Sequence, residues 1–381
     1  MTTPTEKGKI YKQRLKLLEK AAADGDLKTM VELLDLEAGL AEEAKPMFEA
    51  AMRGASAAVA LLLQRGADPN VVIAGNSGWR PLHRTIRHPR SIAWSADHVA
   101  VIELLLQAGA DASARAGGFT PLGSAAQVGN REVVDLLLNR GVAVDFFDAA
   151  LIGDVERVQK ELASRPDAAR ARLANGLTAL HCCALSPLAK RNRKTSAAYA
   201  AIASLLIDAG ADPDDRVFDG EQIRSPLELA VKAGNTAVFR LLLEQGAPPG
   251  NALHRALYDQ QMTMAEDLLA ACPHVDLNPV VDEKLANPLL NEMIRWGKLR
   301  AAQWLLERGV DPNSADKNGW TALFYAARRG LLGIHLEAIL TAGGRLDVRD
   351  AEGKTPLDIA AAHKRRKTLD EFQRWLNESH G

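Results

Sequence analysis

The stretch Leu305-Leu306-Glu307-Arg308-Gly309-Val310 decides the fold, because its pattern returns along the chain. The pattern is a pair of leucines or a leucine and an isoleucine, two further residues, a glycine and a small residue. Copies stand at 62–67, 105–110, 137–142, 206–211 and 242–247, and a looser copy stands at 339–344. Spacings of roughly one to two times 33 residues are typical of stacked structural repeats and not of a single globular core.

A second pattern, Thr-Pro-Leu-His or a near relative, supports the same period. Its copies stand at 80–83, 120–123, 178–181, 225–228, 251–254, 287–290, 321–324 and 355–358. Thr, Ser or Asn at the first position can accept a hydrogen bond from the free N–H groups that begin a helix, and Pro suits the next position. The glycine of the first pattern suits a left-handed residue that ends a helix. Each unit is therefore predicted to hold two helices, a glycine and a loop.

The two patterns together resemble the ankyrin repeat, and the resemblance covers nearly the whole chain. It implies an all-α repeat solenoid, a curved ankyrin-type stack of helix–turn–helix units with short β-hairpin fingers. We expect about eleven units, which begin near residues 10, 46, 76, 115, 144, 175, 220, 250, 285, 316 and 350. The first unit lacks both patterns and is expected to be a degenerate N-terminal cap, and the last is expected to be a C-terminal capping repeat.

Composition agrees with an array of small helices. The chain has 381 residues, only 5% of them aromatic, and a formal net charge of −1. This charge provides no global field that would attract nucleic acid or an anionic membrane. The apolar runs are too short to span a membrane, residues 1–20 lack the apolar segment of a signal peptide, and three cysteines cannot form a disulfide framework. We expect a cytoplasmic protein.

Two junctions between units are shorter than the rest. About twelve residues separate Gly309 from Thr321, and the resemblance implies a β-hairpin finger in this stretch. Gly141 and Gly246 are instead followed almost at once by the next unit. We predict that the missing fingers divide the chain into three sub-arrays, 1–143, 144–249 and 250–381. The alternative is that these are merely short loops in one continuous array.

Two other units carry long connections between their first and second helices. The connection at 88–97 contains Trp94, and the connection at 188–196 contains Lys190, Arg191, Arg193 and Lys194. Both are basic and are expected to project from the same edge of the array. One interpretation is a two-pronged contact with an acidic partner, since insertions on one face of an array often mark binding. The alternative is that long connections cost little free energy and vary freely.

The resemblance also implies a binding surface, because the first helices of ankyrin repeats line a concave groove. The last exposed turn of these helices holds Arg87, His88, Gln127, Val128, Lys232, Tyr258, Arg295, Trp296, Arg328 and Arg329. A second shared position, just before each first helix, holds Trp79, Phe119, Leu177, Trp320 and Lys354. Arg and aromatic side chains are the usual anchors of protein interfaces. The alternative for any single member is a solvated surface residue.

Motifs for catalysis, cofactors or metals are not found in the sequence. His181-Cys182-Cys183 falls within the Thr-Pro-Leu-His pattern, and Cys272-Pro273-His274 has no second ligand pair at zinc spacing. A glycine-rich phosphate loop is also lacking. We therefore expect no enzyme activity, no cofactor and no metal. The basic run at 363–367 indicates either a nucleic-acid contact or the polar exterior of a capping repeat.

The leading hypothesis is a non-enzymatic protein-interaction scaffold that binds through its concave helix and finger surface. One alternative is a regulatory or inhibitory subunit that occludes a partner's active site, and another is a nucleic-acid-binding adaptor that uses the basic loops. We expect a monomer whose partner is another protein with acidic and apolar residues, and we expect neither nucleic acid nor membrane. The candidate partner-binding residues are Trp79, Arg87, His88, Trp94, Phe119, Lys190, Arg191, Arg193, Lys194, Lys232, Tyr258, Arg295, Trp296, Trp320, Arg328 and Arg329.

Overall fold

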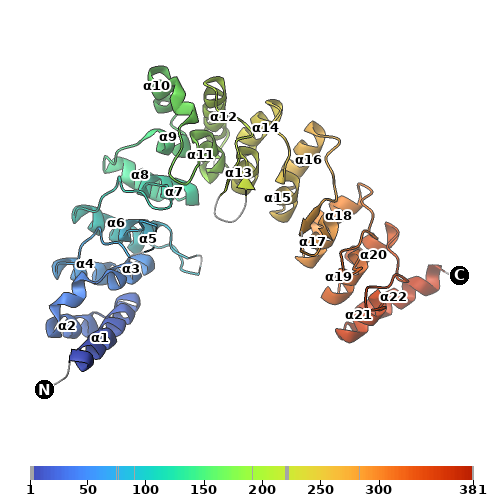
Figure 1. Ribbon diagram of the computed structural model, residues 1–381, viewed down its shortest axis with the longest axis horizontal. Coiled ribbons are helices and arrows are strands. Elements are labelled where there is room, and N and C mark those ends of the chain that lie inside the picture. Colours follow the sequence, from blue (N-terminus) through green and yellow to red (C-terminus); the bar gives the residue numbers. More distant parts are fainter. Residues whose placement is uncertain are drawn as a thin grey trace. The chain divides into compact units, whose positions relative to one another are not determined.

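A computed structural model of the protein describes residues 4–73, 75, 77–89, 91–190, 192–218, 223–282 and 284–379. Within these residues lie twenty-two α-helices, which follow one another as eleven pairs (Figure 1). We number the repeats 1 to 11 by these pairs. The expected all-α ankyrin-type solenoid of about eleven units is confirmed.

The first helices of the repeats are mostly short. They are α1 (Pro4–Asp24), α3 (Ala44–Arg53), α5 (Pro81–Ile86), α7 (Pro121–Val128), α9 (Phe146–Ile152), α11 (Ala179–Leu185), α13 (Pro226–Ala233), α15 (Ala252–Tyr258), α17 (Leu289–Arg295), α19 (Ala322–Arg329) and α21 (Pro356–Ala362). The second helices are α2 (Leu27–Leu36), α4 (Ser56–Gln64), α6 (Ala96–Gln107), α8 (Arg131–Asn139), α10 (Val155–Ser164), α12 (Arg193–Asp208), α14 (Thr236–Glu244), α16 (Met262–Ala271), α18 (Leu299–Leu306), α20 (Ile334–Thr341) and α22 (Arg366–Ser379). Three short 3₁₀ helices are η1 (Ala38–Glu42), η2 (Pro166–Arg170) and η3 (Pro187–Lys190).

The recurring sequence patterns act at the helix ends, as their chemistry predicts. At α7, the Thr120 hydroxyl accepts a hydrogen bond from the Gly123 N–H at 2.9 Å, and Pro121 stands at the first helical position. The helix ends at Gly129, whose φ of 77° lies in the left-handed region. These local interactions determine where each helix begins and ends, so the repeat can be recognised in the sequence.

The fingers are small. The strands β1 (Val217–Phe218) and β2 (Ile223–Arg224) pair antiparallel, as do β3 (Val280–Asp282) and β4 (Asn287–Pro288). Two further fingers are closed by single bridges, Ala116 to Phe119 and Arg172 to Thr178. Neighbouring finger tips are joined through their backbones, for example by a 2.9 Å hydrogen bond from the Ala351 N–H to the Asn318 carbonyl.

The chain divides into two compact units, Met1–Leu241 (unit 1) and Leu242–Gly381 (unit 2). In unit 1 the first helices pack in chain order from α1 to α13, and in unit 2 they pack in order from α15 to α21. The division falls within α14, close to the sub-array boundary expected near residue 249, whereas the boundary expected near residue 143 lies inside unit 1. The arrangement in three sub-arrays stays a prediction.

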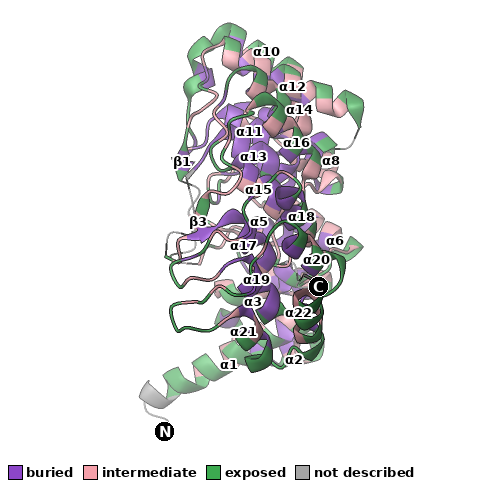
Figure 2. Cartoon of the chain, turned by 90° about the vertical axis from the view of Figure 1, so that its right-hand side faces the viewer, coloured by how far each residue is buried: buried purple, intermediate pink, exposed green. Residues whose placement is uncertain are grey.

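The core of each unit runs along its first helices, which Figure 2 shows largely buried except for the end helices α1 and α21. In α11 every residue from Ala179 to Leu185 is buried, His181 included. The ring of His181 lies 3.0 Å from the Asp215 carbonyl oxygen in the next finger, and burial lowers its pKa to about 4. This histidine is therefore neutral near pH 7 and joins a helix to the neighbouring finger.

Repeats 4 and 5 depart together from this histidine arrangement. The histidine position is Gly123 in repeat 4 and Asp148 in repeat 5. The Thr120 hydroxyl donates to the Asp148 carboxyl at 2.8 Å, and a Cβ atom at position 123 would lie only 2.7 Å from the Asp148 Oδ1 atom. Burial, reinforced by the charge of Asp145, raises the pKa of Asp148 to about 7. The missing side chain in one repeat thus makes room for a buried carboxyl from the next.

Candidate functional site

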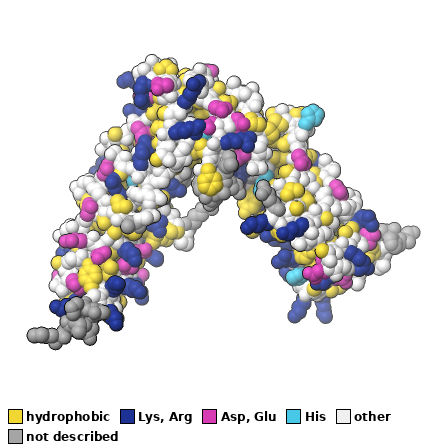
Figure 3. Space-filling view, in the orientation of Figure 1, with side chains coloured by type: hydrophobic (Ala, Val, Ile, Leu, Met, Phe, Trp, Pro, Cys, Tyr) yellow, Lys and Arg dark blue, Asp and Glu magenta, His cyan; other side chains and the backbone are white. Residues whose placement is uncertain are grey.

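A cationic and aromatic surface in unit 2 unites most of the residues predicted there. We call it the α17–α19 surface and define it as Tyr258, Arg295, Trp296, Lys298, Trp320, Arg328 and Arg329. These residues come from the last turns of α15, α17 and α19, from the turn after α17 and from the finger before α19. In Figure 3, dark-blue Lys and Arg side chains line the edge of unit 2 that α17 and α19 form.

Trp296 is the most exposed aromatic residue of this surface. It follows the last residue of α17, and 54% of its surface remains accessible. The Arg295 guanidinium lies 5.4 Å from the centre of its ring, and the Tyr258 ring lies 6.4 Å away at an angle of 75°. The Lys298 ammonium stands 4.6 Å from the centre of the Tyr258 ring. Cations over ring faces at such distances are attracted by the ring quadrupole.

The arginines also hold neighbouring repeats together. The Arg329 guanidinium donates to the Arg295 carbonyl oxygen at 2.8 Å, and the Arg365 guanidinium donates to the Arg328 carbonyl oxygen at 3.2 Å. Each cation therefore sits at the carbonyl end of the first helix in the preceding repeat, where the helix dipole favours positive charge. The side chain of Arg328 differs, because it lies 5.8 Å from the centre of the Trp320 ring.

The carboxylates beside this surface are already engaged. Glu292 is 4% exposed and accepts hydrogen bonds from Arg295 at 2.7 Å and from Asn287 at 2.9 Å. Asp350 accepts a 3.1 Å hydrogen bond from the Trp320 indole N–H. Burial also lowers the pKa of His254, whose ring lies 6.3 Å from that of Tyr258. The surface therefore presents positive charge and aromatic rings together.

In unit 1 the predicted residues of repeat 3 form ring contacts within their own repeat. The half-buried Arg87 guanidinium lies 5.4 Å from the centre of the Trp79 ring, and burial lowers the Arg87 pKa. The rings of His88 and Trp94 stack on each other and pack against the buried His98, with centroids 4.8–5.8 Å apart. Trp94 is half-buried, and its indole N–H donates to the Glu132 carboxylate of repeat 4 at 3.1 Å. Its part in partner binding stays a prediction.

Phe119 is buried, although its sequence position predicts a residue on the binding surface. Its ring is only 3% exposed, because the bridge between Ala116 and Phe119 turns the side chain toward the core. Its carbonyl oxygen lies 3.3 Å from the His83 ring nitrogen of the preceding repeat. Trp79 and Trp320 share its sequence position and are half-buried. We therefore leave Phe119 out of the proposed surface.

The predicted lysines and arginines of the second long connection are exposed. Lys190 ends η3, and Arg193 and Lys194 begin α12, where the Asn192 side chain accepts the Thr195 N–H at 2.9 Å. These three side chains form no ion pair with any residue that the structure describes. Arg191 lies outside the described residues. Lys232 is exposed in the last turn of α13, as its position predicts.

Lys298 is a member of the surface that sequence reasoning missed. It occupies the residue before α18, where Asn130 and Asp154 cap the corresponding helices of their repeats with their side chains. A lysine has no acceptor with which to cap a helix. An unsuitable residue at a capping position was the signal that could have found it.

Over the described residues, His, Cys, Asp and Glu side chains do not form any group of three that could hold a metal ion. Across the same parts of the chain, every helix is too short or too polar to cross a membrane.

Comparison with known proteins identifies the repeats. The model for three copies of the ankyrin repeat matches residues 290–372, and the model for a single ankyrin repeat matches 117–149, 175–217 and 224–252. Residues of the α17–α19 surface fall mainly within the first of these matches. Such repeats form protein–protein interaction modules and are typically non-enzymatic.

Individual relatives resemble parts of the chain. Cyclin-dependent kinase 4 inhibitor B from Bos taurus is 47% identical over 70 residues, which are 18% of this chain and 53% of that protein. Ankyrin repeat domain-containing protein 40 from Homo sapiens is 30% identical over 94 residues, which are 24% of this chain and 25% of that protein. The chain thus spans from a quarter to about half of the length of these relatives.

The chain is also similar to a solved ankyrin repeat domain. The crystal structure of the ankyrin repeat domain of Bcl-3, described as a unique member of the IkappaB protein family, aligns with 67% of this chain and 99% of that one. The TM-score is 0.44 and the sequence identity 23%. The repeat patterns, the helix pairs with their fingers, and the family matches in both units lead to one conclusion: the chain is an ankyrin-repeat protein.

Proposed function

We propose that this chain is a non-enzymatic scaffold whose α17–α19 surface binds a partner segment containing acidic and apolar residues. The observation that carries the proposal is Trp296, which is 54% exposed and lies beside Arg295 and Tyr258. Trp, Tyr and Arg dominate the energetic centres of protein interfaces. Leaving a large indole ring in water forgoes the free energy that its burial against a partner would release.

The charge of the surface selects the partner. Arg295 is balanced by Glu292, whereas the Arg328 guanidinium lies over the Trp320 ring and pairs with no carboxylate among the described residues. A carboxylate can form two parallel hydrogen bonds with one guanidinium, which adds geometric specificity to the attraction. An acidic residue next to an apolar one would therefore engage Arg328 and Trp296 together.

A test must separate binding from folding, because Arg329 also stabilises its own repeat. Replacing Arg329 would remove the 2.8 Å hydrogen bond to the Arg295 carbonyl oxygen. Arg328→Glu and Trp296→Ala change the surface without removing such a bond. Matched controls on unit 2 are Arg374→Glu, at an exposed position of α22, and Ile334→Ala, whose side chain is 69% exposed.

The experiment captures partners from the native cell extract with the wild-type chain and measures the dissociation constant of each purified partner by calorimetry. We expect Trp296→Ala to weaken binding by at least about 2 kcal/mol, or roughly thirtyfold, as at interface hot spots. Arg328→Glu should weaken it as well, while both controls bind like the wild type. A partner that binds all four variants with unchanged affinity would contradict the proposal.

A second candidate function is that of a regulatory subunit that occludes a partner's active site. It is supported by the 47% identity to cyclin-dependent kinase 4 inhibitor B, a protein named as a kinase inhibitor. The match covers only 18% of this chain, so it does not define the partner. If the captured partner is an enzyme, adding the wild-type chain should lower its activity and Trp296→Ala should not. If the activity of the partner enzyme stays unchanged at a saturating concentration of the chain, only the scaffold function remains.

A further inference from the structure

Repeat 5 lacks the finger that the other central repeats of unit 1 possess. Val144 leads directly into α9, whose first turn is capped by the Asp145 side chain through the Asp148 N–H at 2.9 Å. Elsewhere the tips of adjacent fingers meet, as where the Gly117 N–H of repeat 4 donates to the Ser77 carbonyl oxygen at 3.3 Å. Repeat 5 contributes nothing to this row of tips.

The fingers on either side close over the missing one. The Asn175 side chain of repeat 6 donates to the Gly117 carbonyl oxygen of repeat 4 at 2.9 Å. A Cβ atom at Gly118 would lie 2.3 Å from the Asn175 amide nitrogen, and Gly118 has a φ of 90°, so this close approach requires glycine. The row of tips therefore continues past repeat 5, although repeat 5 has no finger of its own.

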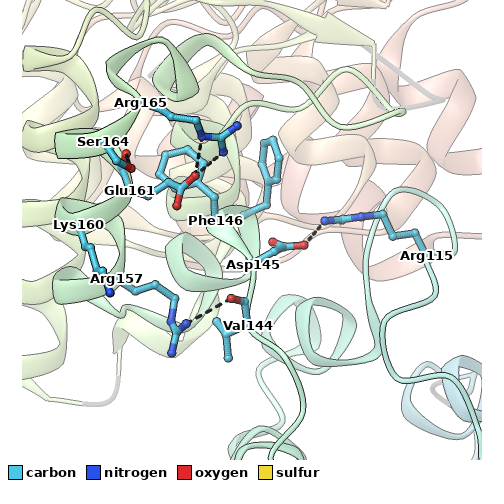
Figure 4. Close-up of a pocket in the computed structure, with 10 residues that line it drawn as sticks. Arg115, Val144, Asp145, Phe146, Arg157, Lys160, Glu161, Ser164 and Arg165 are labelled. Atoms are coloured by element: carbon cyan, nitrogen blue, oxygen red, sulfur yellow. Dashed lines mark hydrogen bonds and ion pairs between the residues drawn. The ribbon is translucent and has the colours of Figure 1, made fainter.

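A cavity of 480 Å³ lies beside the start of α9, at the short junction that replaces the finger of repeat 5 (Figure 4). Its apolar part is formed by Val144, Phe146 and Phe147, and Arg115 reaches it from the finger of repeat 4. The remaining wall is α10 and the residue that follows it. Cavities of about 300–1,000 Å³ are the usual size of small-ligand sites, so this cavity is large enough to hold side chains of a bound segment.

The lining contains four cationic side chains and two carboxylates. Arg115 pairs with Asp145, and Arg165 pairs with Glu161. Arg157 donates to the Val144 carbonyl oxygen at 3.5 Å and lies 3.2 Å from the Asp154 carboxylate just outside the cavity. Lys160 is exposed and has no ion pair with any described residue. An anion could thus approach Lys160 without displacing a carboxylate of the protein.

We propose that this cavity binds an acidic segment of a partner protein at the short junction where repeat 5 has no finger. A carboxylate of the segment pairs with Lys160, and a neighbouring apolar side chain packs on the half-buried Phe147 ring beneath Arg115. The site belongs to unit 1 and is separate from the α17–α19 surface, on which it does not depend.

The test uses fluorescence anisotropy with a short fluorescein-labelled peptide of Glu and Phe residues. Because the α17–α19 surface also favours such a peptide, the full chain carries Trp296→Ala and Arg328→Glu in every sample. Two further changes probe the cavity: Lys160→Glu reverses its free charge, and Ser164→Trp fills its space. Lys16→Glu, at an exposed position of α1, gives the same change in net charge outside the cavity.

We expect saturable binding that Lys160→Glu weakens roughly three- to tenfold, as for a partly exposed ion pair turned into a repulsion. Ser164→Trp should abolish it, Lys16→Glu should leave it unchanged, and a matching peptide of Lys and Phe should not bind. In the chain with Trp296→Ala and Arg328→Glu only, carbodiimide should cross-link Lys160 to the acidic peptide, as mass spectrometry would show. Equal weakening by Lys160→Glu and Lys16→Glu would show diffuse attraction only and overturn the proposal. Absence of saturable binding, or binding that survives Ser164→Trp, would also overturn it.

Discussion

Asp148 provides the sharpest test of the structure, because a buried carboxyl makes stability depend on pH. Its side chain is 1% exposed and its pKa is raised to about 7 from an ordinary value of 3.8, chiefly by burial. A carboxyl whose pKa is higher in the folded chain stabilises the fold fully below pH 3.8, and this contribution is lost as the pH rises through about 7. The full loss corresponds to about 4 kcal/mol.

The perturbation is Asp148→Asn, which keeps an oxygen that can accept the Thr120 hydroxyl but cannot ionise. The advantage of the variant over the wild type should grow by about 1.4 kcal/mol per pH unit between pH 4 and 7 and then level off. Between pH 5 and pH 8 the difference should rise by about 2.5 kcal/mol. The buried histidines, His83 and His181, titrate in both proteins and cancel in this difference.

The assay is urea denaturation of both proteins at pH 5, 6, 7 and 8, followed by circular dichroism. Hydrogen exchange of the α9 amides gives a local reading, since the two compact units need not unfold together. Asp167→Asn, at an exposed position of η2, is the control and should show no such trend. If the free-energy difference between Asp148→Asn and the wild type is the same at pH 5 and pH 8, Asp148 is not held as a buried neutral acid.

Three further predictions concern other buried or bridging groups. Tyr199→Phe should lower the free energy of unfolding by about 1–3 kcal/mol in urea denaturation, because its hydroxyl donates to a buried carbonyl oxygen at 2.6 Å; an unchanged midpoint would argue against that bond. Asn175→Ala should lower the free energy of unfolding by about 0.5–1.5 kcal/mol and speed hydrogen exchange in the fingers of repeats 4 and 6. Faster exchange in the finger of repeat 6 alone would refute the bridge from Asn175 to Gly117. With a thiol reagent at neutral pH, Cys272 should react in the native chain while Cys182 and Cys183, whose thiol pKa values are raised by burial, react only after unfolding; three fast thiols in the native chain would disprove their burial.

The helix pairs could be predicted from the sequence because their limits are set locally. A helix begins at a capping hydroxyl such as that of Thr120 and at a proline, and it ends at a left-handed glycine. These residues lie close together in the sequence, so each copy of the pattern determines its own helix ends. The direction of a finger side chain is different. Phe119 shares a position with Trp79 and Trp320, yet its ring is buried, and this depends on how its finger packs.

The candidate surfaces were predicted in part for the same reason. The positions of Trp296 and Arg328 follow from the repeat period, whereas the cation at Lys298 required attention to a helix cap. The bridge across repeat 5 joins Asn175 to Gly117, 58 positions apart, whereas the sequence shows only a short junction after Gly141. Long-range closure of this kind is set by three repeats at once and cannot be read from any one of them.

The hydrogen bond between Asn175 and Gly117 changes how this array should lose its structure. In a linear solenoid each repeat is coupled only to its nearest neighbours, and unfolding can advance one repeat at a time. Here repeat 4 is also coupled to repeat 6 across repeat 5 by one exposed side-chain hydrogen bond. Opening repeat 5 should therefore cost about 0.5–1.5 kcal/mol more than the loss of its own interactions, a coupling that the regular period of the sequence does not reveal.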